Sequence, residues 1–347
     1  MPPFSNRLIA WQRQHGRHDL PWQGTRDPYR IWLSEIMLQQ TQVATVPPYY
    51  QRFLARFPDV AALAEAPLDA ILAAWAGLGY YARARNLHRC ARQVMERHGG
   101  AFPSRAAELA ELAGVGRSTA AAIAVFSAGE RAAILDGNVK RVLCRHQAIA
   151  GFPGTKAIEN QLWQLAENLL PESDIEAYTQ GLMDLGATLC TRSRPDCAAC
   201  PLAVDCLARL QGRQAELPSP RRRAERPWRE VDCVVLLAGK RVLLERRPPV
   251  GIWGGLLALP EGKADEVCIR FGLPPATATP LPEVDHDFTH FRLRLRPWLC
   301  PLAAALPWAA GEADHRWLDL DEIEAAALPA PVLRLLQSLR PVANAAG

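Results

Sequence analysis

Four cysteines crowded into one short stretch are the residues most plainly suited to chemistry. They follow the pattern C-x6-C-x2-C-x5-C, at Cys190, Cys197, Cys200 and Cys206. Structural zinc sites more often use two separated CxxC pairs, whereas four closely spaced cysteines in one segment suit a cubane four-iron four-sulfur cluster held by four thiolates. The spacing therefore favours iron–sulfur over zinc. Such a cluster would serve either in electron transfer or as a structural clip that presents basic loops.

A glycine-containing segment between two expected helices is suited to binding phosphate. Residues 112–120 read LAGVGRSTA, and the glycines let the backbone turn tightly with its amides exposed. The N-terminus of the following helix adds a favourable dipole. We interpret it as a sequence-independent phosphate site; the alternative is an ordinary glycine turn. The residues assigned to this site are Gly114, Val115, Gly116 and Ser118.

The elements that must position these residues are helical over the first part of the chain. Asp27-Pro28 is a helix start, with Asp as the N-cap and Pro at the first helical position. Apolar side chains then recur at helical spacing, and short Gly or Pro breaks separate the stretches. Further helices are expected near 59–65, 68–76, 83–98, 105–112, 117–128, 137–149, 156–169 and 174–189.

The composition changes after residue 210. Residues 211–229 mix arginine with proline, as linkers do. From residue 230 the apolar period is two, which predicts strands over 231–237, 241–244 and 291–296, with a helix near 331–339 to follow. The sequence thus predicts an all-α domain over 1–210, a basic linker over 211–229 and a smaller α+β domain over 230–347.

The overall composition limits the class of protein. The chain has 347 residues, of which 49% are hydrophobic, and a formal net charge of +4. These values disfavour a disordered or fibrous chain. Nine cysteines without a secretory signal argue against a disulfide framework. We expect a soluble, intracellular protein in which the five scattered cysteines are small buried apolar residues.

Residues 1–210 resemble the endonuclease III superfamily of base-excision glycosylases. The resemblance lies in the hairpin segment, in an aspartate about twenty residues after it and in the spacing of the four cysteines. The longest matches are SEIMLQQTQ at 34–42, GLGYY at 77–81 and LDGNV at 135–139, and the first two resemble the MutY adenine glycosylases. One departure is Ala113, where the family usually carries proline. The resemblance implies a six-helix barrel with a [4Fe-4S] cluster. It also implies a monomeric cytoplasmic enzyme, associated with the nucleoid, that acts on double-stranded DNA with A:8-oxoguanine or A:G mispairs.

Two carboxyl groups carry the expected chemistry. Glu35 lies among apolar residues on a helix, and such a pocket raises the pKa of a carboxyl group and keeps it protonated. By resemblance, Glu35 is the acid that protonates adenine, Asp136 faces the sugar C1′, and Asn138 hydrogen-bonds in the same site. The alternative for Glu35 is a solvated helix position, which its apolar neighbours and the match of the whole segment disfavour. The alternative for Asp136 is an N-cap, a role that is compatible with the catalytic one.

The resemblance assigns further residues. Relatives with lyase activity carry a Schiff-base lysine where this chain has Ser118, so a monofunctional enzyme is expected, although Lys140 is placed to trap some abasic sugar. The base must leave the stack to be cut, and Gln40 and Tyr80 match the residues that wedge into the duplex. Gln23 stands where some relatives have arginine. The matches to the adenine pocket are Leu20, Trp22 and Gln180.

Residues 230–347 resemble the Nudix-like domain that MutY proteins append, best at GIWGGL over 251–256. The glutamate-rich helix of a Nudix hydrolase is missing, so diphosphate hydrolysis is not expected. Phe288, Thr289 and His290 match the family loop that reads 8-oxoguanine. The alternative is that Phe288 belongs to the core and the other two are turn residues.

Three rival functions remain less favoured. Ser118 and the second domain argue against a bifunctional pyrimidine-lesion lyase. The pair Glu35 and Asp136 argues against a non-catalytic DNA-binding iron–sulfur protein. The missing glutamates argue against a Nudix hydrolase.

Overall fold

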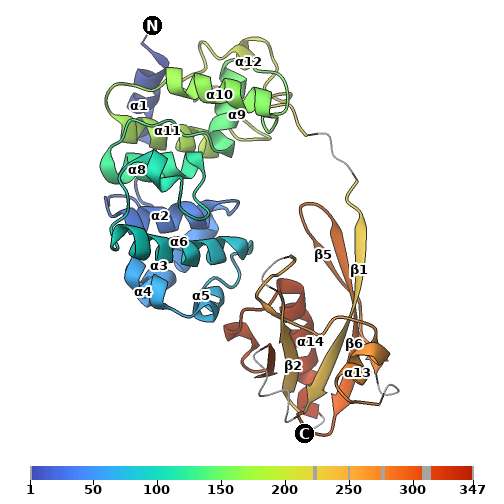
Figure 1. Ribbon diagram of the computed structural model, residues 1–347. Helices are drawn as coiled ribbons and strands as arrows, with labels where there is room; N and C mark the ends of the chain where they lie inside the picture. Colours follow the sequence, from blue (N-terminus) through green and yellow to red (C-terminus); the bar gives the residue numbers. More distant parts are fainter. Residues whose placement is uncertain (1, 222–224, 249–250, 275–277, 307–313, 346–347) are drawn as a thin grey trace. The chain divides into compact units, whose positions relative to one another are not determined.

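The computed structural model of the protein describes residues 2–221, 225–248, 251–274, 278–306 and 314–345 (Figure 1). The chain divides into two compact units, Met1–Ala66 with Arg85–Arg223, and Pro67–Ala84 with Ala224–Gly347. The segment Pro67–Ala84, which the sequence analysis placed in the helical domain, therefore groups with the C-terminal part. The domain bounds 1–210, 211–229 and 230–347 remain a prediction, and residues 222–224 of the linker lie outside the described residues.

The first unit is helical in its described residues, as predicted. Within it, α1, α9, α10, α11 and α12 gather at one end, α2, α3 and α4 at the other, and α8 lies between (Figure 1). Its helices are α1 (Phe4–His15), α2 (Pro28–Leu38), α3 (Val46–Arg56), α4 (Val60–Glu65), α6 (Ala82–His98, whose first turn belongs to the second unit), α7 (Ala106–Leu109), α8 (Arg117–Ala128), α9 (Gly137–His146), α10 (Lys156–Asn168), α11 (Ile175–Thr188) and α12 (Leu207–Leu210), with a 3-10 turn η1 (Val43–Thr45).

Capping residues fix where the site helices begin. The Asp27 side chain accepts a hydrogen bond from the Tyr29 backbone N–H at 2.9 Å, with Pro28 at the first position of α2. This confirms the predicted start. Asp136 caps α9 in the same way, accepting from the Val139 N–H at 2.7 Å. Both helices thus begin at an aspartate, and one of these is a candidate catalytic residue.

Two predicted helices are shorter than expected, for local backbone reasons. The helix expected over 105–112 is the single turn α7, because the backbone after it makes tighter i to i−3 hydrogen bonds, from the Glu111 N–H to the Glu108 carbonyl and from the Leu112 N–H to the Leu109 carbonyl. The helix expected over 137–149 ends at His146, because Ala148 takes a left-handed φ of 47° that a helix does not allow.

The second unit is built on one sheet whose path is β3-β2-β1-β6-β4, with β5 paired to β6 and β7 to β2. The long strands β1 and β6 run parallel, and the other pairs are antiparallel. Its elements are α5 (Leu68–Ala74), β1 (Trp228–Ala238), β2 (Arg241–Arg246), β3 (Leu257–Ala258), α13 (Ala264–Arg270), β4 (Thr279–Pro280), β5 (Val284–Asp287), β6 (Arg292–Leu302), β7 (His315–Asp319), η4 (Ile323–Ala325) and α14 (Ala330–Ala345).

Alternation along β1 divides the core of this unit between the two faces of the sheet. Val235 and Leu237 pack in a cluster with residues of α14, whereas Val234 and Leu236 pack in a second cluster with residues of α13. The period of two read from the sequence is confirmed, as are the predicted strands and the closing helix. The result is the expected all-α part followed by a smaller α+β part.

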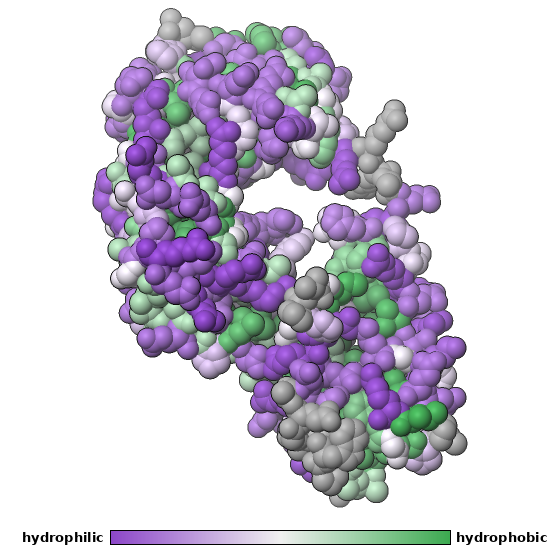
Figure 2. Space-filling model, in the orientation of Figure 1, coloured by the Kyte–Doolittle hydropathy of each residue, from purple (hydrophilic) through white to green (hydrophobic). Residues whose placement is uncertain are grey.

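The described helices include none that is long and apolar enough to cross a membrane. On the face shown in Figure 2, hydrophilic side chains predominate and apolar patches are scattered among them.

Candidate active site and cysteine cluster

A cavity of about 570 Å³ opens in the helical unit between α2, α11 and the loop that follows α1. Four of the predicted site residues line it together: Glu35, Leu20, Trp22 and Gln180. Apolar side chains from three helices complete the wall, among them Ile31 and Leu38 of α2, Phe126 of α8 and Met183 of α11. A mostly apolar cavity with a few convergent polar groups is the usual form of a small-ligand site.

Glu35 is a carboxyl group in this wall whose pKa lies well above its ordinary value. It follows Ser34 on α2, among buried side chains such as Ile31 and Ile36. Burial, and to a lesser extent the nearby charge of Asp136, together raise the pKa of Glu35 to about 8. Glu35 therefore holds its proton at neutral pH, as its apolar neighbours predicted. A carboxylic acid poised in this way can donate a proton to a bound base.

Asp136 stands at the start of α9, beside the cavity and close enough to Glu35 to influence its charge. Burial also raises the pKa of Asp136, but hydrogen bonds from the Val139 and Asn138 N–H groups and the positive charge of Arg141 oppose that shift. The two carboxyl groups thus differ in environment. Glu35 is kept neutral mainly by desolvation, whereas Asp136 has donors and a cation that favour its ionised form.

Asn138 connects Asp136 to a more distant part of the unit. Its Nδ2 approaches Asp136 Oδ2 at 3.5 Å, and its Oδ1 accepts from Arg141 Nη2 at 2.8 Å. Arg141 also donates to the backbone carbonyls of Gly186 and Cys190, each at 2.7 Å. A Cβ on Gly186 would lie 2.6 Å from the Asn138 Cβ, so only glycine allows α9 and α11 to approach here. The sequence analysis found Asn138 but missed Arg141.

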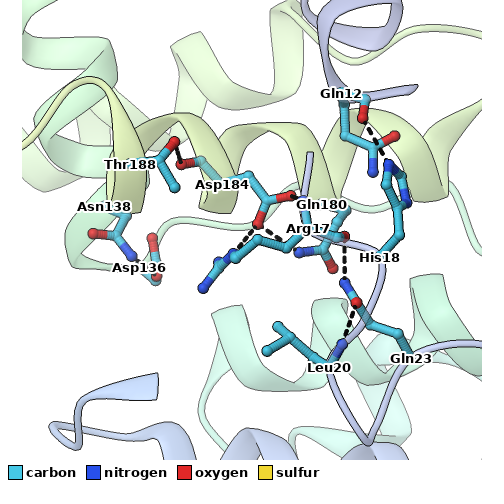
Figure 3. A network of polar contacts seen from close by, with 10 residues as sticks. All are labelled: Gln12, Arg17, His18, Leu20, Gln23, Asp136, Asn138, Gln180, Asp184 and Thr188. Atoms are coloured by element: carbon cyan, nitrogen blue, oxygen red, sulfur yellow. Dashed lines mark hydrogen bonds and ion pairs between the residues drawn. The ribbon is translucent and has the colours of Figure 1, made fainter. Parts of the chain in front are cut away.

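A second polar network holds the loop that carries Leu20 and Trp22 (Figure 3). Asp184 of α11 is fully buried and accepts from the Arg17 backbone N–H at 2.9 Å, from Arg17 Nε at 2.7 Å and from Gln180 Nε2 at 2.9 Å. The Gln23 amide bridges the same loop, accepting from the Leu20 N–H at 3.1 Å and donating to the Arg17 carbonyl at 2.9 Å.

Sequence reasoning named Leu20, Trp22, Gln23 and Gln180 but missed the pair Arg17 and Asp184. One signal was available, since Asp184 lies between Leu182 and Leu185 on a helix whose inner face is apolar. A carboxylate at such a position is rarely buried without a charged partner.

Gln40 and Tyr80 share an unusual backbone conformation. Their φ angles are 58° and 48°, in the left-handed region that residues with a Cβ adopt infrequently. Both side chains reach the surface, and Tyr80 is 51% exposed. The two residues belong to different units. Strained backbone of this kind is often found at functional positions.

The hairpin between α7 and α8 places its glycines at the surface. A Cβ on Gly114 would lie 2.7 Å from the Asn86 Cβ, so the positive φ and the close approach both require glycine there. Gly114 and Gly116 are exposed, whereas Val115 is buried and its N–H donates to the Leu112 carbonyl at 3.1 Å. The Ser118 hydroxyl accepts from the Leu135 N–H at 2.9 Å, next to Asp136. Of the four residues assigned to phosphate, Val115 and Ser118 therefore already have partners within the protein.

The four clustered cysteines line one small cavity of about 30 Å³, together with residues of α9. Within the described residues, no three His, Cys, Asp or Glu side chains are placed to hold a single metal ion. In the described part of the chain the nine cysteines form no disulfide bond, and the five scattered ones are buried, as expected.

Arg145 of α9 makes several hydrogen bonds to the loop that carries these cysteines. It is buried, and it donates to the carbonyls of Thr191 at 2.7 Å, Arg192 at 3.0 Å and Leu217 at 2.8 Å. Its Nη1 also lies 3.4 Å from Cys190 Sγ. Arg145 therefore links α9 both to the backbone of this loop and to the sulfur of one of the four cysteines.

In the second unit, the segment 288–290 forms the turn between β5 and β6. Phe288 stacks on Phe291 with centroids 4.6 Å apart and contacts Trp253 at 5.6 Å. Thr289 and His290 are exposed at the tip. Phe288 therefore packs against other side chains, as the alternative interpretation expected, and Thr289 and His290 are the two residues of this turn that a ligand can reach.

Comparisons with known proteins agree with this architecture. The model of the HhH-GPD superfamily of base excision DNA repair proteins matches residues 33–168, and that of the NUDIX domain matches residues 232–338. The adenine DNA glycosylase of Buchnera aphidicola subsp. Acyrthosiphon pisum is 33% identical over 97% of both chains. The chain belongs to the adenine DNA glycosylase family.

Other relatives of this adenine DNA glycosylase family member support the assignment. The human adenine DNA glycosylase is 35% identical over 97% of this chain and 74% of its own length. Among solved structures, a thermostable thymine-DNA glycosylase is 30% identical with a TM-score of 0.55, over 60% of this chain and 95% of the other. The resemblance to base-excision glycosylases inferred from the motifs is therefore confirmed.

Proposed function

We propose that this protein hydrolyses the N-glycosidic bond of adenine mispaired with guanine or 8-oxoguanine in duplex DNA. The observation that carries the proposal is Glu35, a carboxylic acid with a pKa near 8 in the wall of a cavity large enough for a purine, beside a second carboxyl group. An acid for the leaving group and an anion for an oxocarbenium-like sugar are the two requirements of glycoside hydrolysis. The names of the relatives support adenine as the base removed.

The reaction follows from the different environments of the two carboxyl groups. The adenine nucleotide leaves the duplex stack and its base enters the cavity. Glu35 donates its proton to the base, the C1′–N9 bond breaks, and its electron pair goes to the departing base. Asp136 stabilises the positive charge at C1′. The oxygen of a water molecule then bonds to C1′, and its proton passes to the Glu35 carboxylate, which restores the acid.

The chain favours hydrolysis over strand cleavage. Ser118 cannot form a Schiff base, and its hydroxyl already accepts from the Leu135 N–H. The amine of Lys140 donates to Glu159 Oε1 at 2.5 Å, so it is already engaged in an ion pair within the protein. We therefore propose a monofunctional enzyme with at most weak lyase activity.

Contacts to DNA are proposed from three surface features. The exposed glycines Gly114 and Gly116, at the start of α8, offer backbone to a phosphate. Gln40 and Tyr80 are proposed to wedge into the duplex at the mispair, where their strained, exposed placement puts them at the surface. We propose that one chain acts alone on each lesion in the cytoplasm, on nucleoid DNA.

The first prediction concerns the two carboxyl groups. Glu35→Gln should lower the single-turnover excision rate by about 100- to 10,000-fold, because an amide cannot donate the proton. Asp136→Asn should lower it by about 100-fold or more, because the charge at C1′ loses its counter-ion. Duplex binding should persist in both. The control is Glu172→Gln, which makes the same carboxylate-to-amide change in an exposed ion pair with Arg131. Near-normal excision by Glu35→Gln would disprove the acid role.

We further propose that Cys190, Cys197, Cys200 and Cys206 hold one [4Fe-4S] cluster. All four side chains line one shared cavity, and four cysteine thiolates are the usual ligands of such a cluster. When bound, the cluster would supply a cross-link between the ends of the loop. Arg145 and Arg141 then tie that loop to α9.

The second prediction follows from this assignment. Anaerobically purified protein should contain four irons per chain and absorb broadly near about 400 nm. Cys197→Ser should lose iron and weaken duplex binding more than it alters the chemistry of bound complexes. The matched control is Cys144→Ser, since Cys144 is a buried cysteine of α9 outside the cavity. One zinc and no iron in the unsubstituted protein would rule out the cluster.

The third prediction concerns the proposed Nudix-like reader over 230–347. Because Thr289 and His290 are exposed while Phe288 packs inward, the variant Thr289→Ala/His290→Ala should lose lesion contacts without loss of packing. We expect the ratio of excision opposite 8-oxoguanine to excision opposite guanine to fall by about tenfold, the effect of a lost base contact. Excision opposite guanine should be unchanged. An unaltered ratio would place lesion recognition elsewhere.

A further inference from the structure

The hairpin between α7 and α8 packs on one face of α6. Gln93 Oε1 of that helix accepts a hydrogen bond from the Ala113 N–H at 2.8 Å. Proline at position 113 would have no N–H to donate, so this contact depends on the alanine that this chain carries there. Asn86, two turns earlier on α6, meets Gly114 so closely that a Cβ on the glycine would lie 2.7 Å from the Asn86 Cβ. Residues three and seven apart share a helix face, so position 89 lies on the same side of α6.

Arg89 occupies that position and is exposed. Its Nη2 donates to Asn86 Oδ1 at 2.8 Å, which holds the guanidinium beside the residue that contacts Gly114. A guanidinium has five N–H donors, and this neutral amide oxygen takes one of them. Among the described residues, no carboxylate forms an ion pair with Arg89, whereas Arg92 on the same helix pairs with Glu96. The positive charge of Arg89 is therefore not compensated by a carboxylate within the described structure.

The arginine of the hairpin itself is already engaged. Arg117 pairs with Glu167 and lies 3.8 Å over the Trp163 ring. Arg89 instead has a second cation close by, since burial and the positive charge of Arg89 both lower the pKa of Arg85, one turn earlier on α6. Like charges four residues apart on a helix repel each other. An anion bound at Arg89 would relieve that repulsion.

We propose that Arg89 binds a phosphate of the DNA backbone, next to the phosphate held at Gly114 and Gly116. This inference rests on the proposed function and extends the DNA contact from the hairpin backbone to a side chain of α6. A guanidinium fork matches phosphate oxygens and can bind two of them at once. Such a contact fixes the register of the protein on the duplex without reading its sequence. Arg89 is thus a binding residue and takes no part in the chemistry.

The test is the salt dependence of equilibrium binding by the full-length protein to a short undamaged duplex. An undamaged duplex allows binding to be measured without excision. The dissociation constant is measured between about 50 and 200 mM salt for the unsubstituted protein and each variant. The variants are Arg89→Gln and Arg89→Lys. The matched control is Arg92→Gln, which removes the same charge from an exposed residue of the same helix that already has a carboxylate partner.

Each variant has a distinct expected result. One phosphate contact contributes about 0.9 to the slope of log K against log salt concentration, so Arg89→Gln should make the slope shallower by about that amount. It should also weaken binding by about tenfold at the lowest salt, equally for undamaged and mispaired duplexes. Arg89→Lys should keep the slope because it keeps the charge. Arg92→Gln should keep both the slope and the affinity.

The proposal is overturned if Arg89→Gln and Arg92→Gln give the same slope and affinity, because the effect would then be one of net charge. It is also overturned if Arg89→Lys loses as much of the slope as Arg89→Gln. Circular dichroism and the Tm of each variant check that the fold is retained, which the exposure of Arg89 favours. A protein that binds duplexes but excises no adenine would refute the proposed function, and the salt slopes would still decide the role of Arg89.

Discussion

The burial of one carboxyl group is the constraint on which the site depends. Desolvation raises the pKa of Glu35 to about 8, with the charge of Asp136 as a second cause. A carboxyl group whose pKa is raised in the folded state contributes stability at low pH and loses that contribution as pH rises through the folded value. Above about pH 4.5, the ordinary value, Glu35 therefore increasingly opposes folding. The apolar wall that keeps Glu35 protonated at neutral pH therefore also lowers the stability of the folded state.

Helix α9 connects this site to the cysteine loop. Its first turn holds Asp136 and Asn138, and its later turns carry Arg141 and Arg145, which bind carbonyl groups of the segment that contains Cys190. The close approach of α11 at Gly186 completes the junction. The cysteine cavity and the carboxylate at the other end of the helix thus share one support, α9.

Many of the helices and strands could be predicted from the local pattern of the sequence. The helices, the caps at Asp27 and Asp136 and the strands with a period of two were predicted because each depends on residues close together in the chain. The pairing of Arg17 with Asp184 joins residues 167 positions apart, and Arg141 reaches a carbonyl 49 positions away. A single sequence shows periodicity but not such partners. Apolar neighbours and the motif resemblance indicated Glu35 and Asp136, whereas the polar contacts that hold the site together could not be predicted.

The protonation of Glu35 is the central claim, and the pH dependence of excision tests it most directly. The measurement is the single-turnover rate of adenine excision by the full-length protein between about pH 6 and pH 10, with the substrate duplex saturated by enzyme. A required acid with a pKa near 8 predicts a level rate below about pH 8 and a fall of about tenfold for each further pH unit. A rate that stays level or rises from pH 8 to pH 10 would contradict the account, because Glu35 would then act without its proton.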